Sequence, residues 1–334
     1  MNGTVFSLAT FGGAPGGDFA AIEIGDSAVA LDWVYPAYRD SGRGKAGPLT
    51  ATDSISGLLE GWDRNFPVLQ EIVAFIEDEG LDSDRLDGAV AKVSGLRALA
   101  PVRNPGKIFN AAQNFQAHVD EMIRAGTSEG AGSEFTGERS TSRPYLFLKA
   151  PSVLAGANDD IAIPRGMEKI DWEAEIACAI WKKAKRVRAE NALDHVAGFM
   201  TTNDVSCRDI GMREDRPALR TDWLGGKSHD NFAPMGPRFV PIAFVGDHMN
   251  LFLRLTVNGE VKQDGNTSQF IYTPEEQIEF ASNILTVQPG NLFVCGTCGG
   301  VGMGTGEFLK VGDVMETEVE GLGKMTNRFV EDRS

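Results

Sequence analysis

The sequence predicts a mixed α+β fold dominated by β-strands, with a smaller N-terminal α+β domain at residues 1–103 and a larger domain at residues 104–334. The chain has 334 residues, which is long enough for two unequal domains. Residues 99–106 contain prolines and a glycine that cannot continue a regular element, so they indicate a linker. After this linker, strand and turn signals outnumber helix signals.

The N-terminal domain is expected to begin with a β-hairpin and to contain one clear helix. Residues 19–24 and 27–32 flank a glycine-aspartate turn, which is the pattern of a hairpin. Residues 66–79 carry apolar side chains at helical spacing, and Gly80 is placed to end that helix.

In the larger domain the strongest turn signal is Asn258-Gly259, which favours a two-residue hairpin loop. Thr273 and Glu276 form a capping box with proline at the first helical position, so a helix is expected to run from there to about Thr286. The segments with strand character are residues 251–257, 260–263, 292–295 and 314–320.

Composition excludes several classes of function. The net charge of −15 argues against binding to nucleic acid or to an anionic membrane surface, because both require a basic patch. No apolar run has the length of a membrane span, and residues 1–6 carry no secretory signal, so a cytoplasmic location is predicted. The cysteines are therefore expected to be reduced thiols. They are Cys178, Cys207, Cys295 and Cys298.

The stretch from Asp171 to Ile180 alternates strictly, and it places Asp171, Glu173 and Glu175 on one face of a predicted strand. Side chains two residues apart on a strand lie about 6.5–7 Å from each other. Carboxylates this close repel each other unless a cation lies between them, and Mg²⁺ prefers carboxylate oxygens. The alternative is a solvated strand face that holds no ion.

Two further segments could contribute to a site. Asp204, in a polar stretch between apolar ones, could supply a third carboxylate, or it could cap a helix. His118 and Glu121 are three residues apart and would share one face of a helix, where the carboxylate could fix the imidazole tautomer and raise its basicity. The alternative for that pair is an ordinary surface helix.

Two glycine-rich segments do not fit nucleotide-binding motifs. A phosphate loop around Lys227 would require glycine at position 221, which is Thr221. Lys227 is therefore a cation in a tight turn, which could bind a substrate carboxylate or have no such role. Residues 296–306 contain no G-x-G-x-x-G, and we expect a backbone that approaches a ligand closely there. The Cys295-x-x-Cys298 pair at this segment has no second pair to complete a zinc site. The two cysteines could be small packing residues in a tight loop, or they could form a redox pair.

Taken together, these segments resemble the fumarylacetoacetate hydrolase family from about Lys107 to Val330. The resemblance rests on six motifs in order, at residues 147–152, 171–175, 203–209, 226–228, 257–260 and 296–297. It implies a mixed β-roll catalytic domain, a homodimer, and a metal site made of Glu173, Glu175 and Asp204. Mg²⁺ is the implied ion, with Mn²⁺ or Ca²⁺ as alternatives.

The resemblance also implies roles for the remaining candidates. His118 and Glu121 would form a water-activating dyad on a lid that includes the loop at residues 126–138, and Lys227 would act in catalysis. Substrate contacts are implied for Asn114, Lys149, Arg208 and Thr297. Phe115 stands where the family usually has tyrosine, and Cys298 where it usually has proline, so the pocket wall differs.

The implied activity is metal-dependent hydrolysis of a C–C bond in an acylpyruvate or related β-diketo acid, with a 2-oxo acid as the small-molecule partner. The same site could instead serve oxaloacetate decarboxylation, isomerisation of a 2-hydroxydiene diacid, or dehydration of a 2-keto-3-deoxy sugar acid, because a fold does not choose among them. A binding protein that retains the fold without catalysis is the remaining hypothesis.

Overall fold

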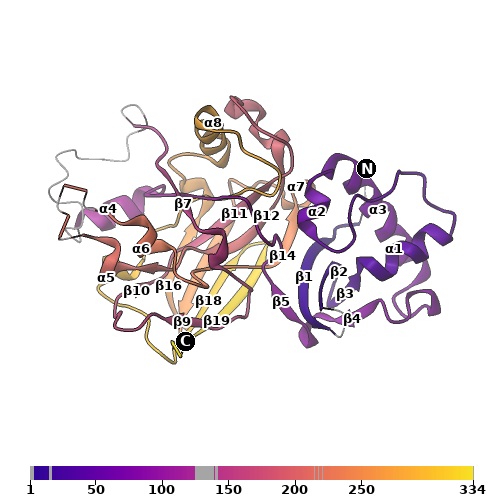
Figure 1. Cartoon of the computed structure of the whole chain (residues 1–334), viewed down its shortest axis with the longest axis horizontal. Helices are drawn as coiled ribbons and strands as arrows, with labels where there is room; N and C mark the ends of the chain where they lie inside the picture. The colour runs from indigo at the N-terminus through magenta and orange to yellow at the C-terminus, as the bar shows by residue number, and fades with distance from the viewer. Residues whose placement is uncertain are drawn as a thin grey trace.

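The computed structural model describes residues 4–14, 17–124, 139, 142–213, 215–216, 218–219 and 221–333. Three β-sheets form its framework (Figure 1). The strands of the twelve-stranded sheet are β1 (Ser7–Ala14), β2 (Gly17–Ile24), β3 (Ser27–Ala30), β4 (Val90–Lys92), β5 (Arg97–Leu99), β6 (Ile108–Ala111), β7 (Leu146–Lys149), β8 (Leu154–Ala155), β11 (Ala174–Ile180), β12 (Val196–Asn203), β14 (Ala233–Pro241) and β17 (Leu292–Val294).

The other two sheets are smaller. The two-stranded sheet pairs β10 (Ile170–Asp171) with β13 (Ser206–Cys207). The five-stranded sheet consists of β9 (Ile161–Ile163), β15 (Phe252–Val257), β16 (Glu260–Asn266), β18 (Val314–Val319) and β19 (Gly323–Glu331).

Helices connect and cover the strands. The α-helices are α1 (Leu31–Asp40), α2 (Ile55–Leu59), α3 (Trp62–Glu79), α4 (Gln116–Arg124), α5 (Arg208–Gly211), α6 (Trp223–Lys227), α7 (Ile242–Val245), α8 (Pro274–Ile284) and α9 (Gly302–Thr305). The 3₁₀-helices are η1 (Asp84–Leu86), η2 (Val93–Gly95), η3 (Pro151–Val153), η4 (Ala189–His195) and η5 (Thr267–Gln269). None of the described helices combines the length and the apolar character needed to cross a membrane. The mixed α+β, strand-rich fold predicted from the sequence is confirmed.

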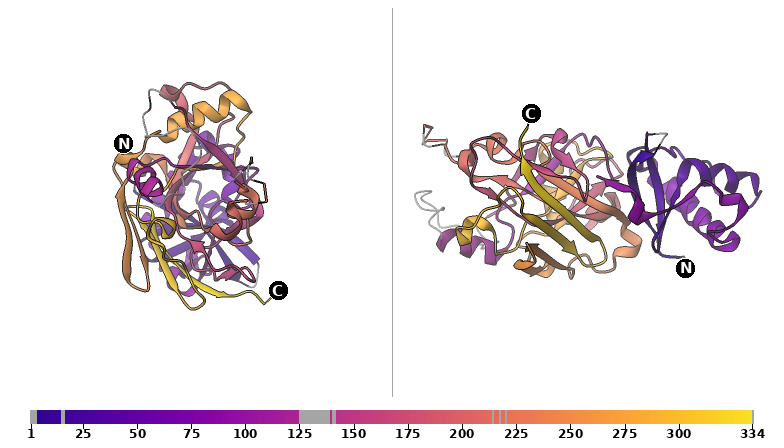
Figure 2. Two further views of the ribbon diagram at one scale, coloured as in Figure 1. Left: turned by 90° about the vertical axis from the view of Figure 1, so that its left-hand side faces the viewer. Right: turned by 90° about the horizontal axis from the view of Figure 1, so that it is seen from below.

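The N-terminal elements gather at one end of the elongated molecule (Figure 2). The predicted hairpin is present as β2 and β3, although its last two residues begin α1. The predicted helix is α3, which starts four residues earlier than expected and ends at Gly80, whose φ is +82°. Strand β1 pairs with β14 through Leu8 and Phe239, so the large sheet runs through both halves of the chain. The division at residue 103 stays a prediction.

The predicted strand at residues 171–180 is interrupted, which corrects the sequence analysis. Residues 170–171 pair with β13, and regular pairing in β11 begins only at Ala174. At the break, side chains replace the ladder: the Asp171 carboxylate accepts from the Trp172 amide at 2.8 Å, and the Asn203 side chain accepts from the Glu173 amide at 3.0 Å. Buried amides need such partners, so the break costs little.

Strand β11 lies at the centre of the core, and both its faces are covered. Ala177 and Ala179 belong to the apolar cluster that also contains the N-terminal helices. Ile176 and Cys178 belong to a second cluster, which extends to the five-stranded sheet. Because neighbouring elements cover both sides, the alternating acidic pattern does not form a solvated face, which was the alternative considered for it.

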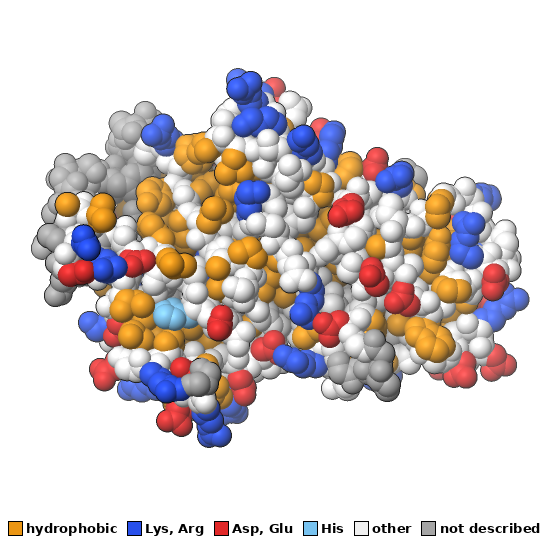
Figure 3. Space-filling view, in the orientation of Figure 1, with side chains coloured by type: hydrophobic (Ala, Val, Ile, Leu, Met, Phe, Trp, Pro, Cys, Tyr) orange, Lys and Arg blue, Asp and Glu red, His pale blue; other side chains and the backbone are white. Residues whose placement is uncertain are grey.

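The C-terminal predictions are largely confirmed. Asn258 and Gly259 have φ of +53° and +82° and join β15 to β16 as a hairpin. Helix α8 begins with a complete capping box between Thr273 and Glu276. The five-stranded sheet packs against the large sheet, with β19 beside β14. Acidic and basic side chains are interspersed over the described part of the face in Figure 3, without a continuous basic stripe.

Candidate functional site

Three buried carboxylates meet where β11 and β12 lie side by side. Glu173 precedes β11, Glu175 lies on it, and Asp204 follows β12. The strands are antiparallel, with Ala174 opposite Asn203, and the Asp204 amide donates to the Glu173 carbonyl oxygen at 2.9 Å. One oxygen from each carboxylate lies within 4.8 Å of the others. Strand register thus brings together two segments thirty residues apart.

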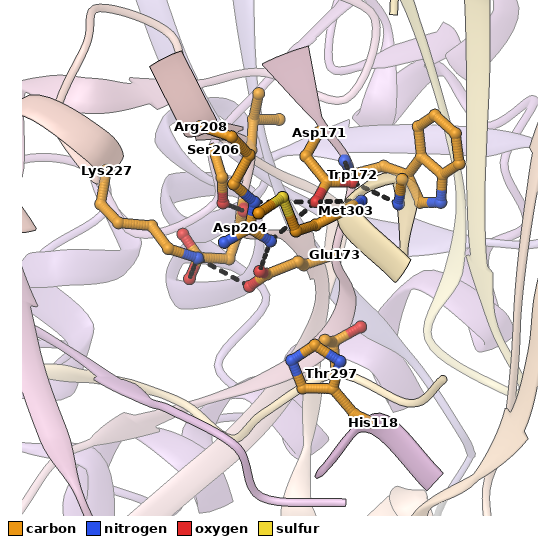
Figure 4. A network of polar contacts seen from close by, with 12 residues as sticks. His118, Asp171, Trp172, Glu173, Asp204, Ser206, Arg208, Lys227, Thr297 and Met303 are labelled. Carbon is orange, nitrogen blue, oxygen red and sulfur yellow. Dashed lines mark hydrogen bonds and ion pairs between the residues drawn. The ribbon is translucent and has the colours of Figure 1, made fainter. Parts of the chain in front are cut away.

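Three cations surround these carboxylates, and Figure 4 shows two of them, Arg208 and Lys227. Lys227 Nζ lies 2.7 Å from Glu173 and 2.8 Å from Asp204. Arg208 Nη2 lies 2.5 Å from Glu173, and Lys149 Nζ lies 2.6 Å from Asp204. Because this site is buried, unpaired charges in it would be costly, and the ion pairs hold Glu173 and Asp204 in place.

Glu175 is the carboxylate of the triad that no described cation pairs with. Its Oε2 accepts a hydrogen bond from the Gly296 amide, but its buried Oε1 has no hydrogen-bond partner among the described residues. Burial, together with the charges of Asp204 and Glu173, raises the pKa of Glu175 well above its usual range. A cation between the three carboxylates would remove this penalty.

A divalent metal ion fits this donor set. Carboxylate oxygens are the ligands that Mg²⁺, Mn²⁺ and Ca²⁺ prefer, and Glu175 Oε1 is a buried acceptor with no described donor. The structure therefore brings the predicted ligands Glu173, Glu175 and Asp204 together.

Asp171 was not assigned a role from the sequence, although it belongs to the same acidic pattern. Its carboxylate accepts from Arg208 Nε at 2.8 Å and from the amides of Gly302 and Met303 at 2.5 and 3.0 Å. It thereby ties the start of α9 to Arg208, which in turn contacts Glu173 (Figure 4). The two-residue spacing was a signal for Asp171, but only the fold shows what it contacts.

Two residues predicted as substrate contacts, Lys149 and Asn114, have their polar hydrogens bound within the protein. The ammonium group of Lys149 is fully buried and donates to Asp204, to the Val205 carbonyl and to the Phe232 carbonyl, which uses all three of its hydrogens. The amide group of Asn114 donates to the carbonyls of residues 272 and 295 and accepts from the amide of residue 272. Neither side chain has a hydrogen left for a substrate, and we assign both to holding the site together.

His118 and Glu121 lie on the same face of α4, as predicted, and both are buried. His118 Nδ1 lies 3.6 Å from Glu121 Oε2, just beyond hydrogen-bond distance, and has no other described partner. The Gly300 amide donates to both Glu121 oxygens at 3.1 Å. Such distances often shorten when a substrate binds. The lid predicted at residues 126–138 lies outside the described residues.

A pocket of about 530 Å³ opens over this cluster. Five of the predicted site residues line it, namely His118, Glu173, Arg208, Lys227 and Thr297. Thr297 Oγ1 donates to the Ala174 carbonyl and accepts from Gln263, so the wall is rigid there. Eight of the remaining lining residues are aromatic or contain sulfur, and they were missed because they come from segments far apart in the sequence. These residues are Met122, Tyr145, Phe147, Cys207, Met212, Trp223, Tyr272 and Met303.

The chain is similar in sequence to proteins that are already known. Residues 107–330 match the sequence profile described as the C-terminal domain of fumarylacetoacetate hydrolase. The mitochondrial oxaloacetate tautomerase of Xenopus laevis is 35% identical over 269 residues, which cover 80% of this chain and 78% of the relative. Because the name of this relative places it in mitochondria, the cytoplasmic location stays a prediction.

Solved structures share the fold. A probable 2-hydroxyhepta-2,4-diene-1,7-dioate isomerase from Mycobacterium abscessus superimposes with a TM-score of 0.71 at 22% identity, covering 99% of this chain and 100% of the other. A fumarylpyruvate hydrolase from Pseudomonas aeruginosa, solved with Mn²⁺ and pyruvate, gives 0.58 at 25% identity and covers 71% of this chain and 92% of the other.

Proposed function

Since this chain belongs to the fumarylacetoacetate hydrolase family, we propose that it is a divalent-metal-dependent tautomerase that moves a proton between carbon and oxygen of a 2-oxo acid. Oxaloacetate is the substrate we propose, because a relative with 35% identity is named an oxaloacetate tautomerase. This activity replaces C–C hydrolysis as the preferred function and belongs to the enolate chemistry considered as the alternative.

One observation carries the proposal: a buried cluster of cations and metal-type carboxylates faces a histidine across the same pocket. Converting a 2-oxo acid to its enol places negative charge on the 2-oxo oxygen, and it also needs a base at the neighbouring carbon. Glu173, Glu175 and Asp204 would hold Mg²⁺, Mn²⁺ or Ca²⁺, and the bound ion would supply positive charge where the oxyanion develops.

His118 is the base in this mechanism. With Nδ1 facing Glu121, the second ring nitrogen is left for the substrate. It takes the proton from the carbon beside the 2-oxo group, and a proton then joins the oxygen, so one C–H bond is exchanged for one O–H bond. Glu121 holds the ring and balances the positive charge that His118 gains. Lys227 and Arg208, which line the pocket, offset the charge of the substrate carboxylate.

C–C hydrolysis of an acylpyruvate is the second candidate. It would use the same dyad to activate a water, and the fumarylpyruvate hydrolase at 25% identity favours it. A single panel of assays separates the two activities. Enolic oxaloacetate is followed by its ultraviolet absorbance, and acylpyruvates are followed by release of pyruvate, each with Mg²⁺ or Mn²⁺ and again with a chelator.

We expect metal-dependent loss of the enol absorbance without release of pyruvate or CO₂, and slow or absent cleavage of acylpyruvates. Chelation should abolish the activity. Tautomerisation that is no faster than in buffer, or that persists unchanged with chelator, would contradict the proposal.

A further inference from the structure

We propose that Arg143 is a specificity-determining residue that binds the far carboxylate of a 2-oxo diacid longer than oxaloacetate. The inference rests on the proposed function, because it needs the 2-oxo acid end to be held near the acidic cluster. It adds a second point of contact with the substrate, at the opposite end of the pocket from the acidic cluster. The names of the similar proteins assign no residue to this contact.

Alternate residues of one extended segment run from the acidic cluster to Arg143. Arg143, Tyr145 and Phe147 all line the pocket, and Lys149, next in the alternation, contacts Asp204. Phe147 lies in β7, and the Tyr145 carbonyl accepts from the Ala112 amide, which continues the pairing with the neighbouring chain. Each two-residue step spans about 6.5–7 Å, so Arg143 lies roughly 13 Å along the backbone from Phe147.

Aromatic rings occupy the interval between the two charged ends. Lys227 Nζ lies 5.4 Å from the centre of the Phe147 ring, which marks the inner end. The Phe147 ring stacks on Trp223 at 4.4 Å, and the Tyr145 ring follows at 5.7 Å from Trp223. This aromatic wall suits the carbon chain of a substrate. It provides no charged partner for the far carboxylate of the substrate until Arg143 is reached.

Arg143 differs from the other pocket cations in its pairing. Arg208 and Lys227 each form ion pairs with buried carboxylates, and the pocket residue Asp222 is already paired with Arg213 at 2.9 Å. Arg143 is exposed and makes no ion pair or hydrogen bond within the part of the chain that the structure describes. A guanidinium group without a partner at a pocket mouth favours a carboxylate, which it can bind through two parallel hydrogen bonds.

The test uses two acids of equal length that differ only at the far end. 2-Oxoadipate ends in a carboxylate and 2-oxohexanoate in a methyl group, and titration calorimetry with Mg²⁺ present gives the dissociation constant of each. The wild-type protein should bind the diacid about tenfold more tightly, which is the size expected for one charge-assisted contact. Arg143→Ala should remove this preference, and Arg143→Lys should keep part of it.

Two further variants serve as comparisons. Arg39→Ala removes an exposed arginine outside the pocket and should leave the ratio of the two dissociation constants unchanged. Trp223→Ala should weaken both acids together, because both chains pack on the same wall. The role of Arg143 is overturned if the wild-type protein binds the two acids equally, or if the preference for the diacid persists in Arg143→Ala. Either result leaves the proposed function standing. If the wild-type protein binds neither acid, the 2-oxo acid site and the proposed function fail with it.

Discussion

Burial decides what each charged residue of the site can do. Lys149 and Lys227 carry the same charge and both contact Asp204, yet only Lys227 lines the pocket. The family resemblance implied a catalytic role for Lys227 and a substrate contact for Lys149. It could not show on which side of Asp204 each ammonium group lies, because that depends on how β7 and α6 pack.

Lys149→Met is expected to destabilise the protein more than it alters substrate binding. Removing the ammonium group leaves Asp204 with one fewer cation and two buried carbonyls without their donor. Breaking a buried ion pair costs about 3–5 kcal/mol. Urea unfolding of the variant measures this loss, and Lys310→Met, at an exposed turn, is the control. A loss below about 1 kcal/mol, in the range of surface ion pairs, would show that Lys149 has no such role.

His118→Gln should lower kcat for oxaloacetate tautomerisation by about 10²–10⁴-fold, since glutamine cannot exchange a proton at neutral pH. KM should change far less, because the carboxylate and 2-oxo groups of the substrate are held by other residues. Asp120→Asn, at an exposed position of the same helix, is the matched control. Steady-state kinetics decide the matter, and a kcat within a factor of three of the wild type would exclude His118 as the base.

At the scale of elements, short interruptions of regular structure build the site. Because of the break between β10 and β11, the Glu173 amide bonds to the Asn203 side chain and not to a neighbouring strand. The turn that leads into α9 places the Gly300 amide within hydrogen-bond distance of Glu121. The alternating pattern indicated the close carboxylates Glu173 and Glu175 but not the break, because the pattern does not show which backbone amides will bond to side chains. The hairpin at Asn258-Gly259 was predictable, since its signal is local.

Gly304 provides a test of how closely α9 and α4 must pack. A Cβ atom built at this position would lie 2.2 Å from the Cγ and Cδ atoms of Glu121, so Gly304→Ala must displace that side chain. We expect kcat to fall at least about tenfold, because Glu121 would no longer hold His118. The free energy of unfolding should also fall, by about 1–3 kcal/mol, because Glu121 is buried and accepts from the Gly300 amide.

Gly95→Ala is the control for this change, because a Cβ atom at Gly95 meets nothing within 4 Å. Kinetics and urea unfolding are measured on both variants. Unaltered turnover in Gly304→Ala would show that Glu121 can move without consequence for catalysis.

For the whole molecule, the sequence predicted the strand-rich fold, the family and the acidic triad, because these rest on local patterns and ordered motifs. The pocket wall was not predictable: Tyr145, Trp223 and Tyr272 come together only through packing of separate segments.

The homodimer that the family resemblance implies is also a property of the whole molecule, because it depends on the surface that two chains would share. Sedimentation equilibrium should give the mass of two chains across micromolar concentrations, and the mass of a single chain would refute it.

The most direct test of the account is titration of Mn²⁺ into the metal-free protein, with Glu175→Gln as the variant. Glu175 is the triad member without a cation, so the wild-type protein should bind one ion per chain. The variant should bind it at least about tenfold more weakly, because a ligand charge is lost. Glu318→Gln, at an exposed position, should bind as the wild type does. Equal affinity in Glu175→Gln, or no binding by the wild-type protein, would contradict the claim that these three carboxylates form a metal site.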